Sequence, residues 1–215
     1  MRRDDAPCSV LLYTIMGSDK EMLRAAIIRT SLEIGSQVGE EGLTMRGIAS
    51  KLGVSATALY QHFDSKASIL EEVRVHGINM LHGELASSAH IPDPANRIIS
   101  LCKGYITFAR TNPWLYRLIA EQEADWDELN DEQREQTMAP LLMVRRWLAE
   151  GKENGQWHEG FDVDMNSLQM WVAVHGLCSL LIAGRLSEKH PWMPVPDQSQ
   201  FISNFVNHLI DSFRA

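Results

Sequence analysis

Apolar residues recur every three or four positions along almost the whole chain of 215 residues, whereas the strict alternation typical of a half-buried β-strand is scarce. Prolines and glycines interrupt this pattern, above all at His90–Pro94 and His190–Pro196. Stripes with helical spacing can be buried only when helices pack against one another. The sequence therefore predicts an all-α fold.

Capping residues and breaks divide the pattern into separate helices. The N-terminal helices are expected from Asp19 to an end between Gly35 and Gly42, over 45–52, over 55–62, and from Asp64 or Ser65 onward. The C-terminal helices are expected over 95–111, 113–122, 131–154, 164–187 and 198–213. This order predicts a small helical domain over 19–64 and a larger one over 65–215.

The first segment, 1–18, is expected to be a disordered leader. Its apolar stretch Cys8–Met16 follows Arg2 and Arg3, as in a signal peptide, but the stretch is short and Asp4 and Asp5 interrupt the basic part. The methionine that ends the stretch is an alternative start of the native chain.

Charge and cysteine content narrow the class of protein. The formal net charge of −8 excludes a protein coated with basic surface, although a local basic footprint is still compatible with nucleic-acid binding. The three cysteines form no CxxC pair and the eight histidines form no HxxxH pair, so we expect no disulfide framework, no metal site and no cofactor. A reducing cytoplasm fits this cysteine usage. No apolar run approaches the ~20 residues of a membrane span.

The most informative stretch is Leu43–Phe63. Two short helices are joined there by a turn that contains Gly53, which is the helix-turn-helix pattern. Leu59 is apolar and is expected in the core between the helices. The only charged residues of the stretch are Arg46 and Lys51, so the surface that would meet phosphate carries no carboxylate. The pattern favours a DNA-binding domain, with an ordinary helical hairpin as the alternative.

A closer resemblance rests on three runs: Thr44-Met-Arg-Gly-Ile-Ala49, Leu52-Gly-Val-Ser55 and Leu59-Tyr-Gln-His-Phe-Asp-Ser-Lys66. They resemble the N-terminal signature of the tetracycline-repressor (TetR) family, and the likeness extends without gaps from about Ala25 to Leu70. The resemblance implies a homodimeric, all-helical regulator, usually a repressor and not an enzyme. Such a regulator binds a palindromic DNA operator and is released when its C-terminal domain binds a small molecule.

The resemblance also implies roles for individual residues. Contacts with base edges are expected from Arg46, Ala56, Thr57 and Gln61. Phosphate contacts are expected from Thr44, Ser55, Tyr60, His62 and Lys66. A lysine at a helix N-terminus opposes the helix dipole, and a nearby phosphate would explain Lys66. Because the recognition helix is rich in small residues, part of the specificity is expected from DNA shape.

The C-terminal domain shows a weaker resemblance, carried by Trp171-Val-Ala-Val-His175-Gly176, to the Trp-His-Gly subgroup of this family. In the family, the last two long helices form the dimer interface, which places it here at 164–187 and 198–213. The second of these helices carries an apolar stripe of Phe201, Phe205, Leu209 and Phe213. From the residues alone, such a stripe is either core or a partner face.

Aromatic and methionine side chains of the C-terminal domain are candidates for an effector pocket, because such side chains line adaptable apolar cavities. An ordinary core position is the alternative for each. The candidates are Tyr105, Phe108, Trp114, Tyr116, Met138, Met143, Trp147, Trp171 and His175. They predict an apolar or aromatic effector, with His175 as a polar anchor or a hydrogen-bonded core residue.

Three alternatives concern the acidic run and the class of the protein. The acidic run Glu121–Glu135 is expected to be a solvated loop and helix start, with a cation-binding pocket mouth as the alternative. An enzyme is not favoured, since the chain has no GxSxG, HExxH or phosphate-binding glycine loop. A helical adaptor that dimerises without DNA is the remaining rival.

Overall fold

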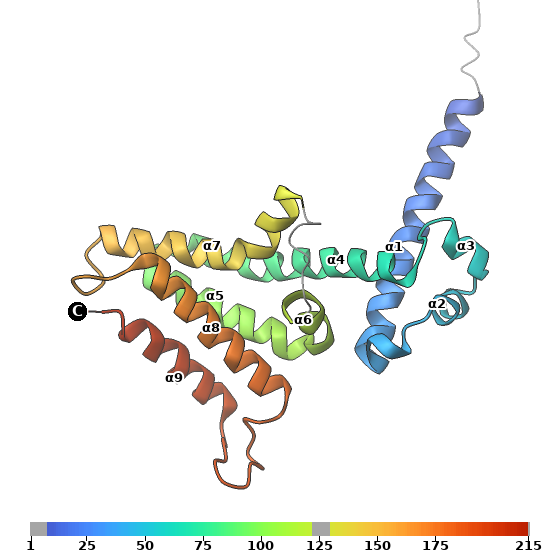
Figure 1. Cartoon of the computed structure of the whole chain (residues 1–215). Helices are drawn as coiled ribbons and strands as arrows, with labels where there is room; N and C mark the ends of the chain where they lie inside the picture. The colour runs from blue at the N-terminus through green and yellow to red at the C-terminus, as the bar shows by residue number, and fades with distance from the viewer. Residues whose placement is uncertain (1–7, 122–129, 215) are drawn as a thin grey trace, which may run out of the picture. The chain divides into compact units, whose positions relative to one another are not determined.

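Helices and their connecting loops make up the computed structural model, which describes the backbone of residues 8–121 and 130–214 and the side chains from Asp19 onward. No strand occurs in these ranges, which confirms the predicted all-α fold (Figure 1). The chain forms two compact units, Met1–His76 and Gly77–Ala215.

The N-terminal unit contains the helices α1 (Cys8–Gly42), α2 (Met45–Leu52), α3 (Ala56–Tyr60) and the first part of α4 (Lys66–Ala86). Its core consists of apolar side chains with no exposed surface, one or two from each helix and its flanking turn. These are Ile27, Leu43, Ile48, Leu59, Ile69 and Val73. The predicted span of α2 is confirmed, and α3 begins and ends within its predicted range.

The helix α1 corrects two expectations. It begins at Cys8 rather than Asp19, so the segment predicted as a disordered leader is helical from Cys8 onward, while residues 1–7 lie outside the described part. Between Cys8 and Asp19 there is no proline and one glycine, Gly17, which a helix tolerates. Near its other end the backbone departs from helical geometry at Gly39, with φ 74° and ψ −178°.

The division between the units falls between His76 and Gly77, inside α4, and not at the predicted boundary between residues 64 and 65. The difference arises because Ile69 and Val73, in the first turns of α4, are fully buried in the core of the N-terminal unit. A helix boundary in the sequence is therefore not the boundary of the packed unit.

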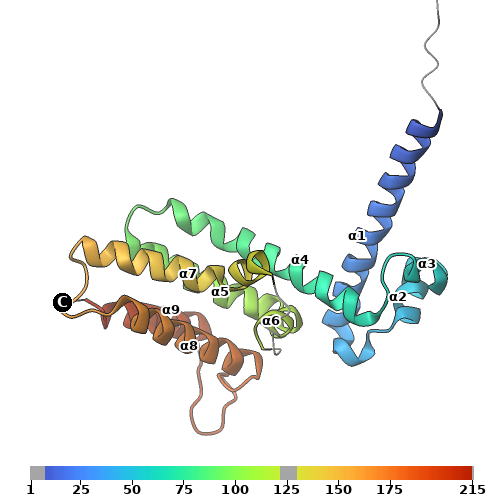
Figure 2. The same cartoon turned by 45° about the horizontal axis from the view of Figure 1, so that its top comes forward.

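The C-terminal unit continues from α4 through η1 (Ser87–His90), α5 (Pro94–Thr111), α6 (Pro113–Ala120), α7 (Asp131–Glu153), α8 (Val163–Ile182) and α9 (Gln198–Asp211). The helix α5 packs against α6, α7, α8 and α9, and this makes it the centre of the unit (Figure 2). The helix α8 ends at Ile182, five residues before the predicted end at 187. Just beyond this end, the Arg185 amide donates a hydrogen bond to the Leu180 carbonyl at 2.9 Å.

The apolar stripe predicted on α9 is divided between two environments. Phe213, just beyond the helix, is 5% exposed and packs against Phe161 and Trp157, with ring centroids 5.3 and 6.3 Å away. It therefore belongs to the core of its own chain. Phe201 is exposed, while Phe205 and Leu209 are half-buried, because the side chains facing the core from this helix are Ile202, Val206 and Ile210.

The helix α8 is long and apolar enough to cross a membrane by length and composition, with a mean hydropathy of 1.3, although the sequence contained no uninterrupted apolar run of that length. One such helix is weak support for a membrane span, since core helices of soluble proteins pass the same test. Here 28% of that stretch is buried within the unit, including Met170, Leu177 and Cys178.

Candidate nucleic-acid interface and effector pocket

The helix-turn-helix is built by two side-chain caps and one glycine. Thr44 begins α2 and its Oγ1 accepts a hydrogen bond from the Gly47 amide at 3.0 Å. Ser55 begins α3 in the same way, with its Oγ accepting from the Ala58 amide at 3.1 Å. Gly53 ends α2 with φ 70°, a left-handed conformation that L side chains adopt at a cost. These features fix the sharp turn before α3.

Most residues predicted to contact DNA are exposed on this motif. The exposed ones are Thr44, Arg46, Ser55, Thr57, Tyr60 and Gln61. Ala56, His62 and Lys66 are partly buried. Since Thr44 and Ser55 use their oxygens as acceptors in helix caps, each hydroxyl proton is still available to a phosphate oxygen.

The positive charge of the motif is concentrated at Arg46. Lys51, the other cation, lies 3.1 Å from the Glu33 carboxylate on α1, which offsets its charge. Arg46 is exposed and forms no ion pair within the described ranges 8–121 and 130–214. The surface of α2 and α3 therefore offers one unpaired guanidinium beside several hydrogen-bonding side chains.

Lys66 has a partner inside the chain. Its Nζ donates to the Glu40 backbone carbonyl at 2.6 Å, near the end of α1. This contact explains a lysine at the start of α4 without a phosphate, because the last carbonyls of a helix attract cations. A phosphate contact from Lys66 stays a prediction.

His62 lies in a different environment from an exposed phosphate ligand. Its Nδ1 is buried and has no hydrogen-bond partner among the described residues. Burial lowers its pKa, and the positive charges of Lys20 and Arg24 lower it further. A neutral imidazole is thus favoured near pH 7, so His62 would meet a phosphate as a hydrogen-bond donor rather than as a cation.

Arg24 was missed by the sequence reading, although it holds the end of the recognition helix. Its guanidinium donates to the His62 carbonyl at 3.1 Å and to the Glu72 carboxylate at 2.7 Å, and it lies 4.4 Å from the centroid of the Phe63 ring. The contact links α1 to the segment after α3 and to α4. Nothing in the local sequence distinguishes this arginine from a solvated one.

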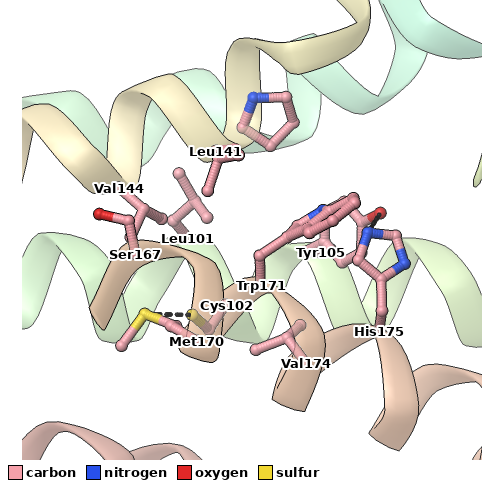
Figure 3. A pocket seen from close by; sticks show the side chains of 11 residues that line it. Leu101, Cys102, Tyr105, Leu141, Val144, Ser167, Met170, Trp171, Val174 and His175 are labelled. Carbon is pink, nitrogen blue, oxygen red and sulfur yellow. Dashed lines mark hydrogen bonds between the residues drawn. The ribbon is translucent and has the colours of Figure 1, made fainter. Parts of the chain in front are cut away.

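The C-terminal unit contains a small apolar cavity between α5, α7 and α8 (Figure 3). About 30 Å³ of it is open to a molecule the size of water. Its walls come from Leu101, Cys102, Tyr105, Pro140, Leu141, Val144, Ser167, Met170, Trp171, Val174 and His175. Tyr105, Trp171 and His175 stand together at one end of it (Figure 3).

These three residues are among the predicted pocket residues, but the predicted residues Phe108, Trp114, Met143 and Trp147 do not line the cavity. Phe108 and Trp147 are buried core side chains, and the guanidinium of Arg97 lies 5.5 Å from the Trp147 ring centroid. Trp114 and Met143 are half-buried elsewhere. That a residue is aromatic did not predict whether its side chain lines the cavity or packs in the core, because the inward face of each helix depends on its packing partners. The aliphatic residues that line the cavity cannot be distinguished in the sequence from ordinary core residues.

His175 is the polar centre of this region. Its Nδ1 lies 2.8 Å from the Tyr116 hydroxyl and its Nε2 lies 3.1 Å from the Tyr105 hydroxyl. Burial lowers the pKa of His175 and raises the pKa of both tyrosines. Burial also raises the pKa of the neighbouring Cys178 thiol to about 12. All four groups are therefore uncharged near pH 7. Both ring nitrogens of His175 lie within hydrogen-bond distance of a phenol, and a role of His175 as the polar anchor of a ligand stays a prediction.

The acidic run is only partly described. Glu121 accepts a hydrogen bond from the Ser179 hydroxyl at 2.9 Å, and residues 122–129 lie outside the described part. Asn130 and Gln133 form a capping box at the start of α7, which agrees with the expected helix start. In the described ranges no three acidic, histidine or cysteine side chains gather as a metal site. The cation-binding alternative stays untested.

Comparisons with known proteins now bear on this arrangement. The profile of bacterial regulatory proteins of the tetR family matches residues 27–73, and that of the tetracyclin repressor-like C-terminal domain matches residues 98–200. The nucleoid occlusion factor SlmA of Vibrio cholerae is 31% identical over 168 residues, which are 71% of this chain and 79% of that protein. This chain belongs to the tetR family.

Other relatives share the N-terminal part. The tetracycline repressor protein class C of Escherichia coli is 49% identical over 51 residues, which are 24% of this chain and 23% of that protein. The regulator YobS of Bacillus subtilis is 29% identical over 90 residues, or 42% of this chain and 47% of that protein. The chain thus covers less than half the length of these two relatives.

Solved structures agree on the fold. A protein of unknown function from Rhodococcus sp. RHA1 has a TM-score of 0.75 and 20% identity, with 90% of this chain and 96% of that chain covered. A tetR-family regulatory protein from Rhodococcus RHA1 has a TM-score of 0.65 and 20% identity, with 89% and 97% covered.

Membership of the tetR family makes the protein a helix-turn-helix transcriptional regulator and not an enzyme. The first profile spans all the predicted DNA-contacting residues, and the second spans every residue that lines the cavity. The resemblance of the C-terminal domain to the Trp-His-Gly subgroup stays a prediction.

Proposed function

We propose that this protein represses transcription by binding a palindromic operator as a homodimer, and that a small molecule bound in the C-terminal unit releases it. The observation that carries the DNA-binding part is the surface of α2 and α3. Arg46, Thr57 and Gln61 are exposed there, and no carboxylate lies between Leu43 and Phe63. An acidic chain that keeps one surface free of acid is suited to meet a polyanion there. Because the protein would bind DNA, we propose that it acts in the cytoplasm.

Selection from genomic fragments followed by fluorescence anisotropy tests this part. We expect nanomolar binding to a palindromic site and much weaker binding to random duplex, both falling steeply with salt. The absence of salt-dependent duplex binding, with and without candidate effectors, would remove the DNA-binding proposal.

The homodimer is proposed through α8 and α9. Large apolar side chains are exposed along α8, and Phe201 on α9 is 36% exposed. Those on α8, leaving aside Trp171 at the edge of the cavity, are Met165, Leu168, Val172 and Leu180. An exposed apolar stripe of this length is typical of a surface covered by a partner, and a second copy fits because the interface of a twofold dimer pairs each face with itself.

Light scattering at micromolar concentration tests the dimer with a matched pair of variants. Val172 on α8 is 64% exposed and Val38 on α1 is 60% exposed. Val172→Asp is expected to shift the mass toward that of a monomer, because it would bury two unpaired carboxylates in the interface. Val38→Asp is expected to leave the dimer intact. A monomeric wild type, or equal effects of the two variants, would contradict the interface.

A second candidate function is nucleoid occlusion, which the printed name of the Vibrio cholerae relative gives for that protein. The identity of 31% over 168 residues is the reason to consider the same function for this protein. Chromatin immunoprecipitation separates the two candidates. A repressor is expected at one or a few promoters, whereas many sites spread over the chromosome without changes in transcription would favour nucleoid occlusion.

A further inference from the structure

We propose that the cavity of the C-terminal unit binds an uncharged, largely apolar molecule through one carbonyl or hydroxyl oxygen, which hydrogen-bonds to the Tyr105 end of the Tyr105–His175–Tyr116 network. The consequence of binding for DNA release rests on the proposed function, whereas the binding itself does not.

The walls of the cavity exclude a charged ligand. None of the residues that line it is Lys, Arg, Asp or Glu. Of its polar residues, Ser167 already donates its hydroxyl proton to the Val163 carbonyl at 2.6 Å. An ionised group placed here would lose its hydration without gaining a counter-charge, which costs several kcal/mol by general desolvation arguments. A neutral ligand follows.

The hydrogen-bond network leaves one polar position for such a ligand. Neutral imidazole has one N–H donor and one acceptor nitrogen, so one of the two phenols donates to His175 and the other accepts from it. When Tyr105 accepts from Nε2, its own O–H proton is free to donate to a ligand carbonyl. When Tyr105 donates, its oxygen is free to accept from a ligand hydroxyl.

The far end of the network is closed by protein, which leaves the Tyr105 end for a ligand. Tyr116 is 1% exposed and is not among the side chains that line the cavity. Tyr105, by contrast, lines the cavity (Figure 3).

The size of the cavity sets how a ligand enters. About 30 Å³ accommodates a water molecule but not a ring, so a ring-sized ligand requires a wall to move. Trp171 is the wall residue suited to this, because it is 41% exposed at the cavity edge. Its ring centroid lies only 4.9 Å from that of His175, one turn away on α8. Outward rotation of the Trp171 side chain would open the polar end of the cavity.

Three probes of nearly equal shape test the inference by calorimetry on the full-length protein: acetophenone, cumene and benzoate. Acetophenone offers a carbonyl, cumene replaces it with carbon, and benzoate carries a charge. We expect acetophenone and cumene to bind and benzoate not to bind. Tyr105→Phe is expected to weaken acetophenone about 2- to 10-fold, the range of one neutral hydrogen bond, and to change cumene by less than about 2-fold. Thr107→Val, which removes an exposed hydroxyl from the same helix α5 outside the cavity lining, is the matched control.

Four outcomes would each overturn the inference. In Tyr105→Phe, the affinities for acetophenone and cumene could fall equally, or neither could fall. In the wild type, benzoate could bind most tightly, or none of the three probes could bind. A measurement on the wild type covers the case in which Tyr105→Phe does not fold. The imidazole ¹⁵N resonances of His175 should shift with acetophenone and not with cumene. If they respond alike to both probes, the network does not read the oxygen.

DNA release is measured separately, by adding acetophenone to the operator complex. Binding that depends on Tyr105 without any loss of operator affinity would leave this site in place and contradict the effector part of the proposed function. Operator release that is unaffected by Tyr105→Phe would place the effector elsewhere and overturn the site instead.

Discussion

The Tyr116 hydroxyl on α6 lies 2.8 Å from Nδ1 of His175 on α8, and both groups are uncharged. Tyr116→Phe is expected to lower the free energy of unfolding by about 1–3 kcal/mol, because it leaves one nitrogen of the half-buried His175 imidazole without its partner. Urea denaturation measures this. Tyr60→Phe, with Tyr60 54% exposed, is expected to change the stability by less than about 0.5 kcal/mol. Equal effects at both positions would show that the bond is not stabilising.

Stability is expected to fall as the solution is acidified below neutrality. Burial lowers the pKa of His175, and burial with Lys20 and Arg24 lowers that of His62, relative to about 6.5 in the unfolded chain. Between the lowered pKa and about 6.5 the unfolded chain binds more protons, so the free energy of unfolding rises with pH in this window.

Denaturation at several pH values between about 5 and 8 tests this linkage. His175→Gln should reduce the slope of stability against pH, and His208→Gln, at an exposed position on α9, should leave it unchanged. A slope that survives His175→Gln and His62→Gln together would contradict the assignment.

Arg24 is expected to position the recognition helix without touching DNA. Arg24→Lys keeps the charge but loses the planar contacts with the His62 carbonyl, the Glu72 carboxylate and the Phe63 ring. Operator affinity should fall by about 1 kcal/mol, or about fivefold. The salt dependence of binding should not change, whereas Arg46→Ala should reduce its slope by about one. A reduced slope in Arg24→Lys would instead indicate a phosphate contact.

Gln61 is expected to read a base. Gln61→Ala should cost about 1–3 kcal/mol on the operator and relax the preference at one base pair, because the amide of an exposed glutamine can bond to a base edge in two places. A selection experiment with randomised operators measures this. Unchanged base preference, with affinity lost equally on random duplex, would make Gln61 a phosphate contact.

Two glycines of α4 give a matched test of its packing on α6. A Cβ at Gly77 would lie 2.6 Å from Cδ1 of Leu115 and 2.9 Å from Cδ1 of Ile119, whereas a Cβ at Gly83 meets nothing within 4 Å. Gly77→Ala is expected to destabilise by about 1–3 kcal/mol through overpacking. Gly83→Ala should stabilise by up to about 1 kcal/mol, the difference in helix propensity. Thermal unfolding of the two variants measures both effects, and stabilisation by both would show that α6 yields at this contact.

By itself, the sequence determined the helical class, the helix-turn-helix and most helix ends. These depend on local chemistry: apolar spacing, the caps at Thr44 and Ser55, and the turn glycine Gly53 act over a few residues and can be read directly. The start of α1 was misread because Asp19 has the chemistry of an N-cap, whereas the helix continues upstream through Gly17 and Ser18 to Cys8.

Only the tertiary structure decided which side chains meet. Arg24 and His62 are 38 positions apart, and Tyr116 and His175 are 59 apart. Aromatic residues of equal promise were divided between cavity (Tyr105, Trp171) and core (Phe108, Trp147) by the packing of α5, α7 and α8. The physical reason is that a helix fixes the angular position of each side chain locally, while the neighbour it faces is set by how whole helices pack.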